Sequence, residues 1–482
     1  MMIEFESMAL FTNMKEVKQT GKSLDTSAAK LKVFFACSIL NGIYNLPRIR
    51  MYWQQSTRVP IICENISRNQ YFALRTRLKI VDDNAVSKEA RENNRFWKIR
   101  PMIDRIQRAC LQNERTNEIS VDEQMIPFHG KVRMRQFVQG KPHPVGLKNF
   151  VMTTSKGIPL DLQMYEGKGK STESCLVLTP EKLDVGGRVA LRLADTLPVG
   201  VSLFTDRFFT SIPLIETLLA RGITLTGTLM KNRIPKEASF RIDNQMKKSG
   251  RGSYDMLVTE NNKIALVKWY DSKPVHIGSS EFGTQPVGLC NRWSKVDNKY
   301  LEIQRPSVVK SYNENMGGVD LLDRVISNYR MKSRTTKWTI RAIYHFVDFS
   351  AAAGLLEYRE DAEAANVPIK EKLDYLDFKF SIAKALLSSG LAANPQNSNS
   401  SDSEDEEAAQ LSRKRRRVEA IPEKRIRKKE SKHLPHFIKD KQKSRSKCRY
   451  PGCKKLTFAK CSLCNVFLCC SVDRNCFMQF HQ

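Results

Sequence analysis

The stretch EISVDEQM, residues 118–125, decides the fold of this chain. Ile119 and Val121 alternate with polar neighbours and lead directly to Asp122. Such alternation predicts a half-buried strand, here with a carboxylate at or near its buried end. One acidic strand is weak evidence for a catalytic site, because such a site needs further acidic residues from other parts of the chain.

Two later segments present an aspartate in a comparable way. VSLFTDRFFTS, residues 201–211, delivers Asp206 from a second alternating strand, and NENMGGVDLLDRV, residues 313–325, delivers Asp320 after a double glycine at the start of a helix. Any one of these aspartates alone is more often structural than catalytic. Because three of them follow a strand, strand, late-helix order, we expect them to meet at one point.

The order of elements around Asp122 predicts the core. Residues 149–154 and 160–167 continue an antiparallel meander, and the strand ending at Asp206 is followed by a helix and by a further strand at 224–230. Three meander strands followed by strand, helix and strand are typical of a ribonuclease H-like sheet, which makes the expected fold class α/β. Fold analogy raises the expectation of a nuclease-like chemistry without proving it.

The remaining segments flank or interrupt this core. Ser27, Ser67 and Ser211 stand where helix N-caps are expected. The segment 233–300 contains short strands separated by turns and predicts a β-rich insertion. The expected domains are a helical dimerisation and DNA-binding domain (1–116 and 336–389), the catalytic core (117–232 and 301–335), the insertion (233–300), a disordered acidic and basic linker (390–447), and a cysteine-rich module (448–482).

Charge identifies the expected class of partner. The chain has 482 residues and a formal net charge of +29. Residues 412–447 are densely basic, but the excess of Lys and Arg extends through the rest of the chain. Each contact between a basic side chain and a phosphate releases counterions. A positive charge spread over most of the chain therefore favours double-stranded DNA as partner over small acidic substrates. The alternative for the basic helix faces is ordinary solvated surface.

Two observations bear on location. The sequence has no run of 18 apolar residues and no basic-then-apolar N-terminal order, which predicts a soluble intracellular protein without a membrane partner. The basic cluster at 413–417, with a second at 424–429, predicts a nuclear localisation signal, an import receptor as partner and a nuclear protein. The alternative is a plain solubilising or DNA-touching tail.

The C-terminal end carries the most specific local signal. Eight soft or borderline ligands crowd into 35 residues: Cys448, Cys453, Cys461, Cys464, Cys469, Cys470, Cys476 and His481. They suffice for two tetrahedral zinc ions in an interleaved arrangement. So short a segment needs metal to fold, and disulfides are a poor alternative in a chain with nuclear features. Cys470 is the least secure ligand because it adjoins Cys469.

The three aspartates suggest a site for a different metal from the zinc of the C-terminal segment. Carboxylates are hard ligands suited to Mg²⁺. Two such ions activate a water or a 3′-hydroxyl on one side of a phosphodiester and stabilise the leaving oxygen on the other. A pure binding module has no need of three buried carboxylates that repel one another without metal.

These motifs together resemble one family. SVDEQMIPFHGK (120–131), TDRFFTSIPL (205–214) and NMGGVDLLDRV (315–325), followed by YRMKSRTTKW (329–338) and the cysteine-rich end, are similar to the piggyBac family of DNA transposases and to the transposable element-derived proteins of animal genomes. The resemblance covers essentially the whole chain.

The resemblance implies a DDD catalytic core with Asp122, Asp206 and Asp320 as Mg²⁺ ligands and Asp323 as an assisting acid. It further implies a DNA transposase that nicks transposon ends, forms hairpins on the excised element and transfers strands into TTAA sites. A cysteine-rich module that reads terminal repeats and a homodimeric form belong to the same expectation.

Two other interpretations remain open at this point. A domesticated descendant would bind DNA as a nuclear regulator or architectural protein and cut nothing. A ubiquitin ligase is suggested by the cross-braced cysteine pattern alone, but the segment is short for that fold and the acidic core argues against it.

Overall fold

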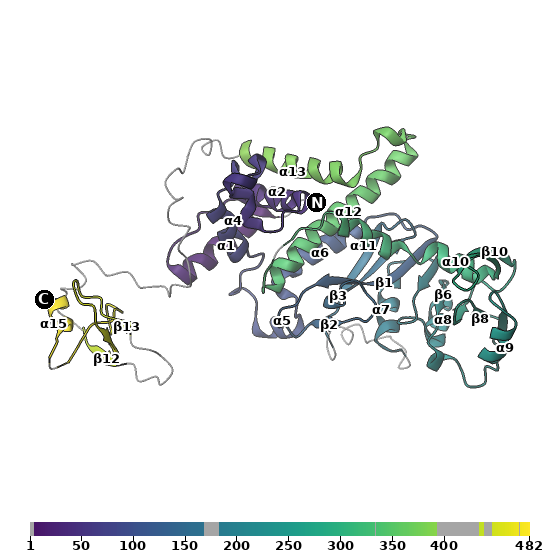
Figure 1. Ribbon diagram of the computed structural model, residues 1–482. Helices are drawn as coiled ribbons and strands as arrows, with labels where there is room; N and C mark the ends of the chain where they lie inside the picture. The colour runs from purple at the N-terminus through teal and green to yellow at the C-terminus, as the bar shows by residue number, and fades with distance from the viewer. Residues whose placement is uncertain (1–3, 168–182, 333, 393–432, 438–445, 472) are drawn as a thin grey trace. The chain divides into compact units, whose positions relative to one another are not determined.

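The computed structural model describes residues 4–167, 183–332, 334–392, 433–437, 446–471 and 473–482. The chain divides into two compact units, Met1–Asn397 and Ser398–Gln482, and each is described by itself (Figure 1). The basic clusters at 413–417 and 424–429, for which we predicted nuclear import, lie outside the described residues.

A nine-stranded mixed sheet forms the centre of the first unit (Figure 1). The strand order is β2-β3-β1-β5-β6-β9-β8-β7, with β4 paired to β3. The strands are β1 (Glu118–Pro127), β2 (Arg135–Phe137), β3 (Val145–Thr154), β4 (Pro159–Met164), β5 (Ser202–Thr205), β6 (Thr224–Thr228), β7 (Tyr254–Val258), β8 (Ala265–Tyr270) and β9 (Pro274–Ser279). The sheet and its helices fit the expected ribonuclease H-like core.

The sheet changes direction at β1. Strands β1 and β3 pair antiparallel along the predicted meander, whereas β1, β5 and β6 pair parallel. Parallel neighbours need crossover connections, and these are α7 (Val185–Ala194) before β5 and α8 (Ile212–Leu219) between β5 and β6. The apolar side chains of Ile119, Val121 and Leu203 are fully buried in the core under these helices.

The predicted N-caps are confirmed. The hydroxyl of Ser27 accepts the Lys30 N–H at the start of α2 (Ala28–Tyr44). Ser67 caps α4 (Arg68–Arg77) in the same way, and Ser211 caps α8. Each cap satisfies one of the backbone donors that the first turn of a helix leaves without a partner.

The β-rich insertion is attached directly to the central sheet. Strand β9 pairs antiparallel with β6, so β7, β8 and β9 extend the central sheet instead of standing apart from it. Gly227 and Gly278 face each other across this pairing, and the hydroxyls of Thr226 and Ser279 are 2.7 Å apart. Pairing removes the open edge that β6 would otherwise present.

The rest of the insertion contains helix α9 (Asp243–Lys248) and a separate hairpin of β10 (Gly288–Ser294) and β11 (Lys299–Arg305). The predicted boundary at residue 300 therefore falls inside a hairpin. Helices α10 (Ser307–Asn315) and α11 (Gly318–Asn328) follow and lead the chain back to the sheet.

Helices from both ends of the first unit share one hydrophobic core. They are α1 (Phe5–Thr20), α2, α3 (Pro60–Cys63), α4, α6 (Arg100–Cys110), α12 (Trp338–Ala364) and α13 (Tyr375–Ala392). The short helix α5 (Lys88–Asn93) has no buried residue. Figure 1 shows α13 beside α2. Their approach is close at Gly390, where a Cβ would lie 2.9 Å from the carbonyl oxygen of Ala29.

A buried ion pair anchors the end of α11 to these helices. Lys379 on α13 and Asp348 on α12 are both inaccessible to solvent and lie 2.5 Å apart. Lys379 also donates to the carbonyl oxygen of Tyr329 at 2.5 Å, and Asp348 accepts the N–H of Met331 at 2.8 Å. Removing one partner of such a pair leaves an uncompensated buried charge, so the arrangement resists displacement.

The second unit is built from short elements. Strand β12 (Pro435–Phe437) pairs with β15 (Ala459–Cys461), β13 (Ser446–Lys447) pairs with β14 (Leu456–Thr457), and α15 (Cys476–His481) ends the chain. The module therefore includes residues that we had assigned to the linker. Its buried cluster consists mostly of cysteines, with Val466, Leu468, Phe477 and Phe480.

Within the described residues, no helix combines the length and hydropathy needed to cross a membrane.

Candidate active site and metal centres

The parallel register of β1 and β5 brings two of the predicted aspartates together. The last parallel pair is Val121 opposite Thr205, so Asp122 and Asp206 follow side by side. Asp122 is not at the end of its strand, because β1 continues beside β3 as far as Pro127. The parallel part of the pairing nevertheless ends at the two carboxylates, as a shared site requires.

Glu123 joins this pair although the sequence analysis did not include it. Oxygen atoms of Asp122, Glu123 and Asp206 all lie within 4.8 Å of one another. Asp122 and Glu123 are buried, with 8% and 7% exposure. Consecutive strand residues normally point to opposite faces, so alternation argued against Glu123, and only the acidic doublet in DEQM hinted at it.

Helix α11 brings the other two predicted acids. A Cβ at Gly318 would lie 2.2 Å from the carbonyl oxygen of Thr154, so only glycine lets the helix begin this close to β3. Asp320 lies at the rim of the site, with its side chain 73% exposed and outside the group of three acids. Asp323, one turn later, accepts a hydrogen bond from Gln124 on β1 at 2.7 Å.

Burial makes these carboxylates resist ionisation. It raises the pKa of Asp122 to about 8, against the opposing effect of Lys141, and the neighbouring Glu123 and Asp206 add to the rise. Burial and Glu123 raise the pKa of Asp206. Burial also raises the pKa of Asp323 to about 6. A cluster of acids that is costly to ionise by itself is one that a bound cation would stabilise.

The donor set fits a divalent cation. All candidate ligand atoms are carboxylate oxygens, which are the ligands that Mg²⁺ and similar hard ions prefer. The Oε2 atom of Glu123 is buried and has no hydrogen-bond partner among the described residues. A buried carboxylate oxygen that lacks a hydrogen bond and lies within a group of acids is consistent with a metal ligand.

The second unit gathers its ligands into two groups of four. The first contains Cys448, Cys453, Cys469 and Cys476, whose sulfur atoms all lie within 4.8 Å of one another. The sulfurs of Cys453 and Cys469 are 3.9 Å apart, far beyond a disulfide bond of about 2 Å. The N–H of Cys469 points at the sulfur of Cys448. The group is compatible with a tetrahedral zinc ion, for which an S–S spacing of about 3.8 Å follows from Zn–S bonds of about 2.3 Å.

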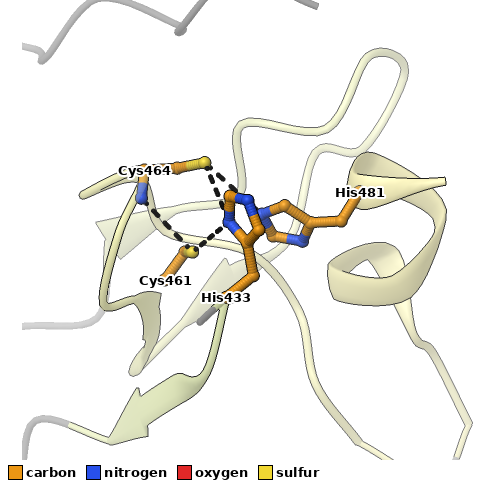
Figure 2. Close-up of side chains that lie close together, drawn as sticks. All are labelled: His433, Cys461, Cys464 and His481. Atoms are coloured by element: carbon orange, nitrogen blue, oxygen red, sulfur yellow. Dashed lines mark hydrogen bonds between the residues drawn. The ribbon is translucent and has the colours of Figure 1, made fainter. Parts of the chain in front are cut away.

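The second group contains His433, Cys461, Cys464 and His481 (Figure 2). Figure 2 shows their side chains pointing toward one another, with Nδ1 of His433 3.4 Å from both sulfur atoms. Nε2 of His481 lies 3.5 Å from the sulfur of Cys464, and its Nδ1 lies 2.7 Å from the carbonyl oxygen of Phe477. A hydrogen bond at the second ring nitrogen is the usual way to orient a metal-binding histidine.

The two groups differ from the predicted set by one residue. Cys470 belongs to neither group, although its neighbour Cys469 does, and His433 completes the second group in its place. His433 was missed because it lies in the polar, basic stretch assigned to the linker. Its position just upstream of a cysteine-rich segment was the one sequence feature that could have indicated His433 as a metal ligand.

Comparisons with known proteins agree with the geometry. A family model described as "Transposase IS4" matches residues 4–352. Human "PiggyBac transposable element-derived protein 3" is 30% identical over 327 residues, which cover 66% of this chain and 53% of the relative. Human "PiggyBac transposable element-derived protein 2" is 30% identical over 338 residues, covering 68% and 55%. The chain belongs to the piggyBac transposase family.

A solved piggyBac structure has the same fold. The cryo-EM structure of a piggyBac transposase synaptic complex with hairpin DNA superposes with a TM-score of 0.66 at 20% identity, covering 81% of this chain and 78% of that one. The piggyBac-family chain described here spans about half the length of the curated human relatives it matches. It is a transposase of that family or a domesticated derivative of one.

A hydrogen-bonded chain connects the acidic site of this piggyBac-family protein to helix α12. Gln124 donates to Asp323, and its Oε1 atom lies 2.9 Å from Nε2 of His345. Nδ1 of His345 lies 3.3 Å from the guanidinium of Arg330. A guanidinium can only donate, so Nδ1 accepts and Nε2 carries the proton. Burial, together with the charges of Arg330 and Arg341, lowers the pKa of His345 well below 6.5.

We expect this histidine to make the fold sensitive to acid. The unfolded chain takes up a proton at His345 near pH 6.5, whereas the folded chain does not. The stabilisation is therefore present above pH 6.5 and is lost as the pH falls below it, by about 1.4 kcal/mol per pH unit. His345→Gln should reduce the loss of unfolding free energy between pH 7 and pH 5 by about 2 kcal/mol.

Urea unfolding of the full chain at several pH values measures this difference. His129→Gln is the matched control, because His129 is exposed on the loop after β1. A pH dependence that is the same in the His345 variant and in the wild type would contradict the assignment of a buried neutral imidazole.

Proposed function

We propose that the chain is a piggyBac-type DDD DNA transposase that performs cut-and-paste cleavage and strand transfer at TTAA sites. The observation that carries the proposal is the convergence of three separate elements on one acidic site. Parallel pairing sets Asp122 beside Asp206, and the close approach of Gly318 to β3 brings Asp320 to the rim.

The proposed roles of the acidic residues follow from how deeply each is buried. The buried acids Asp122 and Glu123 and the half-buried Asp206 would hold divalent cations, and Asp320 would complete the ligand set from the exposed rim. When bound, two Mg²⁺ ions supply activation of the attacking oxygen and stabilisation of the leaving oxygen of a phosphodiester. Asp323 is fixed by Gln124 and would position the start of α11 or assist proton transfer.

Positive charge on these elements supports double-stranded DNA as the substrate. Lys131, Arg133 and Arg135 are exposed on the segment between β1 and β3. On the helical part, burial and the charges of Lys337 and Lys79 lower the pKa of Lys15 to about 8. Cations that repel one another in this way favour a polyanion that neutralises them.

The remaining parts of the proposal concern assembly and location. The cysteine-rich module would bind two structural zinc ions and read the transposon terminal repeats. The helical part would support a homodimer. The basic clusters of the linker would be recognised by a nuclear import receptor and direct the protein to the nucleus.

A reporter excision assay in cells tests the function. The reporter is interrupted by TTAA-flanked terminal repeats of a related element, and Asp122→Asn is the control. We expect seamless restoration of the reporter with the wild type and none with the variant. Restoration that persists with Asp122→Asn would contradict the assigned site.

The second candidate is a domesticated nuclear DNA-binding protein without cleavage activity. The exposure of Asp320 favours it, because that acid lies outside the group formed by Asp122, Glu123 and Asp206. Tight, specific binding to the repeats without excision, for wild type and Asp122→Asn alike, would support this candidate against the first.

A further inference from the structure

The ammonium group of Lys141 lies among the acids of the proposed metal site. Its Nζ atom is 3.5 Å from Asp122, 4.0 Å from Glu123 and 3.8 Å from Asp320. The first two carboxylates belong to β1 and the third to α11, so one cation bridges the two elements of the site. The sequence motifs that predicted the four aspartates do not include Lys141, which lies on the loop between β2 and β3.

Lys141 reaches the acids from a loop whose backbone favours a tight turn. The loop connects β2 to β3 and is closed by a hydrogen bond from the N–H of Val138 to the carbonyl oxygen of Pro144. Gly140, just before the lysine, has a positive φ of 90° that other residues rarely adopt. The Lys141 side chain is 22% exposed, so it can leave the acids for solvent without crossing the core.

A second lysine near the acids, Lys148, is held in place by its packing. Lys148 also lies near Glu123, at 3.9 Å, but its ammonium packs over the rings of Phe208 and Phe150, at 3.9 and 4.9 Å from their centroids. Lys148 is only 7% exposed and is fixed by the core. Among the described residues, the ion pairs of Lys141 are all with the acids of the site. Lys141 is therefore the lysine that can move.

We propose that Lys141 is a built-in counterion that occupies the position of a divalent cation in the metal-free protein and is displaced when the cation binds. This inference rests on the proposed function, because it concerns the same acids. A single positive charge shared by three carboxylates reduces their repulsion. The displaced ammonium then belongs to the basic segment between β1 and β3, where it adds to the charge available for DNA phosphates.

Metal binding to the full-length protein tests the competition. Mn²⁺ is the probe, and its affinity is measured by calorimetry for the wild type, Lys141→Met and Lys131→Met. The control variant removes the same charge from an exposed position of the same segment. Loss of the competing ammonium should tighten Mn²⁺ binding about tenfold in Lys141→Met. The control should change it by no more than about twofold, because exposed charges are screened.

The wild-type protein offers a second measurement that does not depend on a variant folding. Acetylation of lysines by a small reactive ester, followed by mass spectrometry, reports how accessible each ammonium is. Mn²⁺ should increase the labelling rate of Lys141 several-fold and leave that of Lys131 unchanged. Labelling of Lys141 that stays constant or slows with Mn²⁺ would overturn the displacement.

The outcomes separate this inference from the proposed function. If the wild type binds Mn²⁺ and Asp206→Asn abolishes that binding, the metal site stands whatever Lys141 does. Unchanged or weaker Mn²⁺ binding in Lys141→Met would then overturn only the counterion role. A wild type that binds no Mn²⁺ at these acids would overturn both.

Discussion

Replacing Asp206 with asparagine is expected to reduce divalent-ion-dependent DNA cleavage by about 10³-fold or more. The amide is nearly isosteric with the carboxylate but supplies no negative charge to a cation. Asp206 is one of the three acids whose oxygens lie within 4.8 Å of one another, so its loss disrupts the densest part of the site. Nicking of a plasmid that carries the terminal repeats, with Mg²⁺ or Mn²⁺, measures the effect.

The same substitution should not harm the fold or DNA binding. Asp206 is half-buried beside Glu123, and partial burial and that neighbour raise its pKa, so a neutral side chain relieves repulsion in the metal-free protein. DNA affinity should be equal or slightly higher because one negative charge is gone. Asp195→Asn is the matched control, since Asp195 pairs with Arg221 at the surface. Undiminished cleavage by Asp206→Asn would refute the assignment of the site.

The sequence predicted the meeting of Asp122 and Asp206 because regular structure determines it. Alternating apolar residues define each strand, and two parallel strands in register must present equivalent positions together. The double glycine before Asp320 was informative for a similar reason. A Cβ at Gly318 would clash with the backbone of β3, so the glycine itself marks close contact between α11 and the sheet.

The residues that the sequence did not reveal depend on tertiary contacts. Glu123 breaks the alternation rule, and Lys141 comes from a loop whose path no periodicity predicts. The same holds for β9, which pairs with β6 although the two strands are far apart in the sequence. Local patterns identified the insertion as β-rich, but they could not show that its strands continue the central sheet.

The cysteine-rich module shows the limit of counting ligands. Eight candidates were expected for two tetrahedral sites, and the structure also groups eight, but it takes His433 in place of Cys470. Adjacent residues such as Cys469 and Cys470 cannot easily turn toward one ion. A histidine that precedes the cluster can reach it once β12 pairs with β15.

Replacing both Cys461 and Cys464 with serine is expected to release one of two zinc ions and to destabilise the second unit around the emptied site. The buried cluster of this unit consists mostly of cysteines, so metal binding must supply most of its folding free energy, on the order of 10 kcal/mol per structural zinc. Metal analysis of the purified protein should fall from about two zinc ions per chain to about one. Binding to specific transposon ends should weaken more than binding to random DNA.

Two single substitutions then decide which eighth ligand the module uses. His433→Ala should weaken zinc binding at the same site as the double variant, because its Nδ1 atom faces both sulfurs. Cys470→Ser should leave about two zinc ions per chain, because Cys470 lies outside both groups. Zinc loss from Cys470→Ser with full retention in His433→Ala would reverse the assignment. Mn²⁺ binding at Asp122 and Asp206 should be unaffected in all three variants, since those acids belong to the other unit.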